Sequence, residues 1–133
     1  MRPEIIEGIQ AHLTPVCLNA KIEILEVAPG HVRLSVEIPP EAINMYGGLH
    51  GGYLYTLCDV ASGMSTYAYE VKNVTQSSNI QYLRVPAITG ILYVESKAIK
   101  RGRTVIVNQV TISDEQEQLL VTSTFNMFVT GTV

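Results

Sequence analysis

The chain has 133 residues, of which 47% are hydrophobic and 16% are charged, and its formal net charge is −3. This composition is too apolar for a disordered chain, and the length suits one domain, so we expect a single domain over residues 1–133. The negative balance argues against a broad nucleic-acid-binding surface, so no nucleic-acid partner is expected.

The two cysteines and the apolar runs argue against further classes. Cys17 and Cys58 have neither metal-ligand spacing nor the pattern of a disulfide framework. Cys58 precedes Asp59 but has no His or other base at a spacing typical of a nucleophilic cysteine. No apolar run reaches membrane-spanning length, and the first residues do not form a secretory signal. We therefore expect a cytoplasmic protein with a buried Cys58, no metal and no membrane partner.

The first third of the chain is predicted to form one helix and two strands. A helix is expected over residues 3–13, where Pro3 suits the first turn and apolar side chains form a stripe. Strands are expected at residues 21–27 and 31–38, the second with unbroken alternation of apolar and polar residues. His31 falls on the polar face of that strand, so we expect it at the surface.

The central stretch combines a glycine-rich loop with one isolated carboxylate. Glycines at positions 47, 48, 51 and 52 predict a loop that ends where a helix over residues 51–69 begins. Between Glu41 and Glu70 the only formally charged residue is Asp59, in an otherwise apolar run. Burying an unpaired carboxylate is costly, so Asp59 either faces water or has a catalytic role.

The distance between the helix start and Asp59 leads to a further inference. The first N–H groups of a helix lack partners and carry partial positive charge, so Gly51 offers a backbone donor for an oxyanion. Eight residues of helix span about 12 Å, whereas a catalytic base must approach its target to about 3 Å. Either the two groups do not cooperate, or Gly51 of one subunit faces Asp59 of another. An antiparallel pair of such helices predicts a homodimer with two shared active sites.

The rest of the chain is predicted to form four strands, at residues 74–85, 91–99, 104–112 and 119–129. Residues 100–103 are expected to form a hairpin turn in which Gly102 takes a positive φ. Short connections favour a mostly antiparallel sheet, and the helix over residues 51–69 is apolar nearly all round, so the sheet should bury it. We therefore expect an α+β fold, an antiparallel sheet wrapped around one long central helix.

One pattern in the central stretch resembles a known family motif. It reads Asn44-x-x-Gly47-x-x-His50-Gly51-Gly52, followed by Asp59 and Ala61. It is similar to the motif of the hotdog-fold acyl-CoA thioesterases, and most similar to the PaaI (phenylacetic acid degradation) type. The resemblance implies the hotdog fold and hydrolysis of an acyl-CoA, either aromatic, such as phenylacetyl-type, or of medium chain length. It also implies a homodimer or a homotetramer, with coenzyme A as part of the substrate and no other cofactor.

The resemblance assigns catalytic roles to five residues. Asp59 would activate a water molecule or attack the thioester itself, and the backbone N–H of Gly51 would polarise the thioester carbonyl. Asn44 would orient water or hold the loop by bonding backbone groups. His50 would line the thioester site or pair with Asn44. Thr75 would position the attacking water, although one of the next three residues could serve instead if the preceding loop differs in length.

The candidates to line a pocket for the acyl group are Met45, Tyr46, Leu49, Leu54 and Met64. Aromatic and Met side chains suit such a pocket and suit a plain core equally well. Tyr46, Leu49 and Gly52 are the residues expected to bind substrate. The N-terminal helix would either pack on the edge of the domain or border this pocket.

The only basic cluster lies on the predicted hairpin and contains Lys97, Lys100, Arg101 and Arg103. A basic hairpin often forms a solvated edge that discourages strand pairing. By the resemblance, Lys100, Arg101 and Arg103 could instead bind the phosphates of coenzyme A through charge-assisted hydrogen bonds.

Two functions other than hydrolysis are compatible with this resemblance, a hydratase or dehydratase and a non-catalytic acyl-CoA-binding module. A hotdog hydratase or dehydratase would use an acid–base pair, for which His50 and Asp59 are present, but its Asp-x-Asn-Pro-x-His signature is absent. A non-catalytic acyl-CoA-binding module would keep the fold and bind acyl-CoA without turnover. Such modules lose the catalytic carboxylate, whereas this chain retains Asp59.

Overall fold

The computed structural model describes the whole chain, residues 1–133. It contains two α-helices, two short 3₁₀ helices and six strands. In chain order these are α1 (Pro3–Gln10), η1 (Pro15–Cys17), β1 (Ile22–Ala28), β2 (His31–Glu37), η2 (Pro40–Ala42), α2 (Gly51–Tyr67), β3 (Val71–Tyr82), β4 (Ile91–Arg101), β5 (Val105–Ser113) and β6 (Leu119–Thr132).

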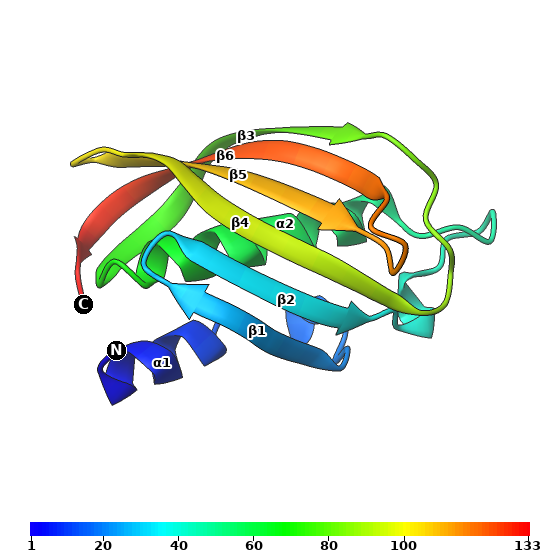
Figure 1. The fold of residues 1–133 in the computed structure, drawn as a ribbon, viewed down its shortest axis with the longest axis horizontal. Helices are drawn as coiled ribbons and strands as arrows, with labels where there is room; N and C mark the ends of the chain where they lie inside the picture. Colours follow the sequence, from blue (N-terminus) through cyan, green and yellow to red (C-terminus); the bar gives the residue numbers. More distant parts are fainter.

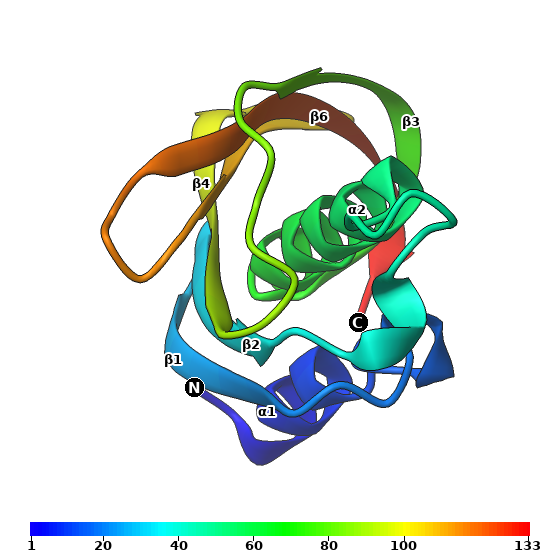
Figure 2. The same ribbon diagram turned by 90° about the vertical axis from the view of Figure 1, so that its right-hand side faces the viewer.

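The strands form one sheet in the order β1-β2-β4-β5-β6-β3, and every neighbouring pair is antiparallel. Figure 1 shows α2 lying along the inner face of this sheet, and Figure 2 shows the strands curving around the helix. Alternation decides which face turns inward, because Val32, Leu34 and Val36 of β2 are buried in the core while the residues between them face outward. The predicted α+β hotdog arrangement is confirmed.

Helix α2 is attached to the sheet by buried polar bonds as well as by apolar packing. The Asn108 side-chain amide of β5 donates to the hydroxyls of Ser62 and Thr66, at 2.9 Å each. The hydroxyls of Ser65 and Ser96 form a hydrogen bond of 2.7 Å between α2 and β4. Because unpaired buried polar groups are costly, these bonds fix the rotation of α2 against the sheet.

The burial of α2 is less complete than predicted. A strip that contains Thr56, Asp59 and Val60 stays partly exposed, although the rest of the helix is largely buried. Helix α1 covers another part of α2, with Ile5 and Ile9 buried in the common core. The exposed strip lies between the N-terminal residues and β3, so a carboxylate on α2 can reach water without leaving the helix.

Several element boundaries differ from the prediction. Helix α1 ends at Gln10 because the N–H groups of His12 and Leu13 bond carbonyls three residues back, which tightens the last turn. Strand β3 spans residues 71–82 instead of 74–85, because its first residues pair with the long β6.

The hairpin after β4 also differs from the prediction. Lys100 and Arg101 belong to the strand, and Gly102 does not take a positive φ. The Gly102 N–H donates to the carbonyl oxygen of Val105 at 3.0 Å, and a side chain at position 102 would run into that oxygen. Glycine is therefore needed here for a close approach of two backbones, and not for a left-handed conformation.

Strands β1 and β3 form the two edges of the sheet. Strand β3 has 12 residues and pairs on one side only, with β6, so its outer row of backbone N–H and C=O groups is free. No helix combines the length and the hydrophobicity needed to cross a membrane.

Candidate active site

A closed loop leads the chain into α2. The Asn44 side-chain oxygen accepts the N–H groups of Tyr46 at 2.9 Å and Gly48 at 3.1 Å, and the Asn44 N–H donates to the Gly48 carbonyl at 2.7 Å. Gly47 has a φ of 78°, in the left-handed region that favours glycine. Asn44 thus bonds the loop backbone, which is one of the two roles considered for it.

The other residues predicted around this loop point in different directions. Tyr46 lies at the tip with 87% of its surface exposed, whereas Leu49 is buried in the core. Gly52 is exposed on the first turn of α2. His50 precedes the helix, is exposed, and forms no side-chain hydrogen bond with Asn44 or with the helix start.

The backbone at Gly51 is free to bind an anion. Gly51 is the first residue of α2, and no side chain caps this end of the helix. The N–H groups of Gly51 and Gly52 have no acceptor within the chain. They carry the partial positive charge of a helix start, so they can stabilise a negatively charged oxygen.

Tyr82 of β3 holds this backbone in place. Its hydroxyl donates to the Gly51 carbonyl at 2.8 Å, and a Cβ at position 51 would lie 3.3 Å from its ring. Burial raises the pKa of Tyr82, so the hydroxyl stays a donor. No site role is predicted for Tyr82 from the sequence, although its alternation with Ser78 and Ile80 is the signal that directs it toward the helix.

Asp59 and Thr75 meet in the structure. The Thr75 hydroxyl donates to a carboxylate oxygen of Asp59 at 2.5 Å and also lies 3.7 Å from the Met127 sulfur. Both residues keep solvent contact, because Asp59 lies on the partly exposed strip of α2 and Thr75 is exposed. One Asp59 oxygen is thus engaged, and the second is available to accept a proton from water.

A β-bulge directs Thr75 toward α2. Thr75 pairs with Met127 and Ser77 pairs with Asn126, so Gln76 is an extra residue without a partner on β6. On the far side of the bulge, Ser78 faces the helix, where its hydroxyl bonds that of Tyr55 at 2.5 Å. In a regular strand without this bulge, Thr75 and Ser78 are three residues apart and would lie on opposite faces, so Thr75 could not reach Asp59.

A cleft of about 620 Å³ lies beside the Asp59–Thr75 pair. We call it the Asp59 cleft. Its walls come from an N-terminal segment, defined here as residues 8–16, from α2 and β3, and from Met127 of β6. The C-terminal part of the region predicted as a helix over residues 3–13 therefore borders the candidate site, which is one of the two positions considered for that helix. His12 in this wall is not predicted from the sequence, because no local pattern connects it with α2.

The predicted site residues do not all come together in one chain. Asp59 is eight residues along α2 from Gly51, a rise of about 12 Å, so the carboxylate and the helix start are separate. The basic cluster lies at the other end of α2, where the Arg101 guanidinium stacks over the Tyr69 ring at 4.2 Å. Lys100 and Arg103 form no ion pair within the chain.

The two cysteines belong to the core. Cys17 and Cys58 are 2% and 0% exposed, so the predicted burial of Cys58 is confirmed. Burial raises the pKa of Cys17 and raises that of Cys58 to about 12. Both thiols therefore stay protonated at neutral pH and are poor nucleophiles.

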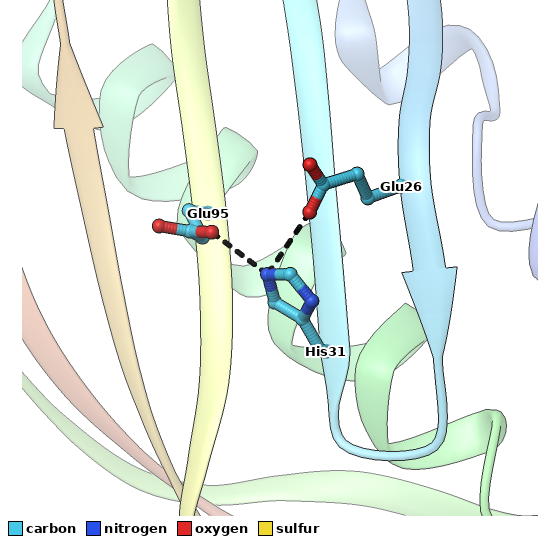
Figure 3. A group of neighbouring side chains, drawn as sticks. All are labelled: Glu26, His31 and Glu95. Atoms are coloured by element: carbon cyan, nitrogen blue, oxygen red, sulfur yellow. Dashed lines mark hydrogen bonds and ion pairs between the residues drawn. The ribbon is translucent and has the colours of Figure 1, made fainter.

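A second group of titratable residues lies on the outer face of the sheet, away from Asp59. His31 stands between two carboxylates, with Nε2 at 2.7 Å from Glu95 and 3.8 Å from Glu26 (Figure 3). His31 lies on the polar face of the strand, as predicted. Its side chain is half-buried and paired with Glu95, so it is not a free surface side chain. The three ligand atoms lie within 4.8 Å of one another and could hold a cation. The Lys97 ammonium lies 3.7 Å from Glu95 and would compete with such a cation for this carboxylate.

The sequence of this chain is similar to known proteins over the region that forms this site. The family model described as the thioesterase superfamily matches residues 46–121, which include the start of α2, Asp59 and Thr75. Acyl-coenzyme A thioesterase 13 of Homo sapiens is 28% identical over 97 residues, which cover 71% of this chain and 69% of the relative.

Solved structures show the same fold. A hypothetical thioesterase of Streptococcus pneumoniae TIGR4, solved with coenzyme A, is 31% identical, with a TM-score of 0.88 over 96% of this chain and 98% of that one. Variants of the Streptococcus pneumoniae protein with alanine at an aspartate or at a threonine have also been solved, each 34% identical over 84% of this chain. The E. coli PaaI protein from the phenylacetic acid degradation operon has a TM-score of 0.87 at 16% identity, covering 96% of this chain and 92% of its own.

Proposed function

This chain belongs to the thioesterase superfamily, and from that premise we propose that it hydrolyses acyl-coenzyme A with Asp59 as the base and Gly51 as the oxyanion donor. The observation that carries the proposal is the hydrogen bond from Thr75 to Asp59 in the wall of the Asp59 cleft. The replaced aspartate and threonine of the Streptococcus pneumoniae protein lie 16 positions apart, the spacing of Asp59 and Thr75, which supports the assignment of this pair.

In the proposed reaction Thr75 holds one Asp59 oxygen and the other accepts a proton from water. The resulting hydroxide attacks the thioester carbonyl carbon, and the oxyanion of the tetrahedral intermediate is bound by the Gly51 N–H. The intermediate collapses with cleavage of the C–S bond to a carboxylic acid and a thiolate. The thiolate takes the proton from Asp59, so the carboxylate is restored and no proton is left over.

The proposed site is completed by a second copy of the chain. Because Gly51 and Asp59 are about 12 Å apart along one helix, Gly51 must come from a partner whose α2 runs antiparallel. Two features support such a homodimer: the exposed strip of α2 that carries Asp59, and the free edge of β3 beside it. A further pairing of two dimers into a tetramer would leave these two sites unchanged.

Coenzyme A is proposed as the leaving group because one solved neighbour contains it and the human relative is an acyl-coenzyme A thioesterase. It enters as part of the substrate, and the reaction written above uses no other cofactor. Lys100 and Arg103, which have no ion-pair partner in the chain, are the proposed contacts for its phosphates. An aromatic acyl group such as phenylacetyl, or one of medium chain length, is the proposed acyl part.

The test is release of free thiol from a panel of acyl-CoAs by the wild type and by Asp59→Asn. This change keeps the shape of the side chain and removes its charge, so we expect a loss of at least about 100-fold in kcat/KM. Asp114→Asn is the matched control, because the Asp114 oxygen accepts the N–H groups of Gln116 and Gln118, which an amide oxygen can also do. If folded Asp59→Asn keeps most of its activity, Asp59 is not the base. If the wild type binds acyl-CoA but releases no thiol, the chain is a binding module.

Subunit mixing tests the shared site. Gly51→Pro removes the N–H at a helix position that tolerates proline, so this variant and Asp59→Asn should each be inactive. A mixed dimer of the two contains one intact site if the sites are shared, and none if each site lies within one subunit. We expect mixing of the two folded dimers to restore about a quarter of the wild-type activity, because half of the dimers are mixed and each has one intact site of two. No recovery in verified mixed dimers would refute the shared site.

A further inference from the structure

Beside Asp59, the N-terminal segment places a histidine directly on α2. His12 lines the Asp59 cleft together with Asp59, Gly63 and Tyr67 of the helix. Positions 59, 63 and 67 follow each other at intervals of four residues and so share one face of α2. The cleft therefore runs along the helix from the carboxylate toward the C-terminal end, and His12 lies in its path.

The His12 ring is held firmly. Its Nδ1 lies 2.8 Å from the Gly8 carbonyl oxygen, and since a carbonyl only accepts, Nδ1 carries the hydrogen. The ring also packs edge-on against Tyr67, with ring centroids 5.3 Å apart and an interplanar angle of 67°. A side chain with both a hydrogen bond and an aromatic contact forms a fixed wall rather than a mobile surface group.

Gly63 is what allows the ring to lie so close to the helix. A Cβ at position 63 would be only 3.2 Å from the His12 Cδ2 atom, so the ring covers the place where a side chain would project. Gly63 is four residues after Asp59, which is a rise of about 6 Å along α2. Along the helix axis, Asp59 and the residue that the ring covers are therefore about 6 Å apart, and we take this as the reach available to an acyl group.

The arrangement of the proposed dimer indicates whether the acyl group or the coenzyme A portion of the substrate occupies the cleft between Asp59 and His12. Antiparallel helices that bring Gly51 of one chain to Asp59 of the other overlap between these two positions, so the partner's helix does not cover α2 beyond Asp59. The lining of the whole Asp59 cleft includes Val60, Val74 and Met127, whose apolar side chains suit an acyl group better than the polar pantetheine arm. The amide of Asn73, which also lines the cleft, is engaged by donating to the Gly63 carbonyl at 3.4 Å.

We infer that His12 ends the acyl-binding part of the Asp59 cleft and restricts the enzyme to acyl groups of about six carbons or one aromatic ring. This inference rests on the proposed function. With C–C bonds of about 1.5 Å in a zigzag chain, roughly five bonds cover 6 Å. A longer chain would have to displace the His12 ring from Gly63 and break its bond to Gly8.

The experiment is a chain-length profile of thiol release, with hexanoyl-, octanoyl-, decanoyl- and phenylacetyl-CoA, for the wild type, His12→Ala and His12→Leu. Removal of the ring opens the cleft toward Tyr67, and each newly buried methylene group is worth about fourfold in kcat/KM. We expect the ratio of decanoyl to hexanoyl activity to rise at least about tenfold in His12→Ala. His12→Leu keeps much of the side-chain volume and should keep the wild-type profile. His31→Ala, on the outer face of the sheet, is the matched control and should also leave the profile unchanged.

The outcomes separate this inference from the proposed function. If the wild type hydrolyses acyl-CoA but already prefers decanoyl over hexanoyl, or if folded His12→Ala keeps the wild-type ratio, His12 does not set the chain length and the proposed function stands. If His12→Leu lengthens the preferred chain as much as His12→Ala, blocking by volume is wrong. If the wild type hydrolyses no acyl-CoA at all, both the proposed function and the inference fail.

Discussion

Replacement of Thr75 by valine isolates one hydrogen bond of the proposed site. Valine keeps the β-branched shape that suits a strand, so β3 should stay intact. The change removes the hydroxyl that lies 2.5 Å from a carboxylate oxygen of Asp59. It also removes the weaker contact of 3.7 Å with the Met127 sulfur, which adds little.

The expected loss follows from the type and exposure of this bond. Hydrogen bonds to charged groups contribute about 1.5–3 kcal/mol. Because Asp59 is partly exposed and Thr75 is exposed, the lower part of that range applies, about 1.5–2 kcal/mol. If the bond orients the base in the transition state, kcat/KM should fall about 10- to 30-fold. Thr75→Ser keeps the hydroxyl and should stay within about threefold of the wild type.

The assay is a double-mutant cycle on kcat/KM for thiol release, with wild type, Thr75→Val, Asp59→Asn and the double variant. If Thr75 acts through Asp59, its replacement has no further effect once the carboxylate is gone. Thr111→Val provides the control, because Thr111 lies on the outward-facing side of β5.

Two results would refute this reasoning. A folded Thr75→Val enzyme with activity within about twofold of the wild type would show that the bond does not orient the base. Loss of the same factor in the wild-type and Asp59→Asn backgrounds would show that Thr75 acts on the substrate or water independently of Asp59.

Two further predictions concern stability. Asn44→Ala removes the acceptor of two loop N–H groups and should lower Tm by about 3–5 °C in a thermal melt. Asn44→Asp keeps an acceptor oxygen, so its Tm should stay near that of the wild type. Equal lowering of Tm by both changes would contradict this prediction. Burial raises the pKa of Cys58 from 9.0 to about 12, so above pH 9.0 the unfolded chain loses this proton first and the free energy of unfolding should fall by up to about 1.4 kcal/mol per pH unit. Urea unfolding at several pH values below and above 9.0 gives the free energy of unfolding as a function of pH. Above pH 9.0 this free energy should fall less steeply in Cys58→Ala than in the wild type, and an equally steep fall would mean that another group titrates.

The elements themselves could be predicted because their signals are local. Alternation in residues 31–38 and glycines before residue 51 specify a strand and a helix start within a few residues of chain. The isolated Asp59 stood out for the same reason, as one charge in an apolar helix. Boundaries were less accurate at Gln10 and around Gly102, where the end of an element depends on which backbone groups find partners.

The arrangement of the site depended on contacts between distant parts of the chain. Tyr82 reaches Gly51 across 31 positions, and His12 lies on Gly63 although no sequence pattern connects the two. Predictions from periodicity cannot pair such residues, because the pairing depends on how α1 and β3 pack against α2.

The sequence by itself therefore determined the helix start, the lone carboxylate and the strands of the sheet that surrounds them, since each follows from residue type and spacing within a short segment of the chain. Only the tertiary structure decided that Thr75, and not a neighbour, bonds Asp59. Gln76 is extra in the pairing of β3 with β6, and this bulge reverses which side chains of β3 face the helix. A strand shows no sign of such a bulge until its partner is in place, because the bulge is a mismatch between two strands and not a property of either one.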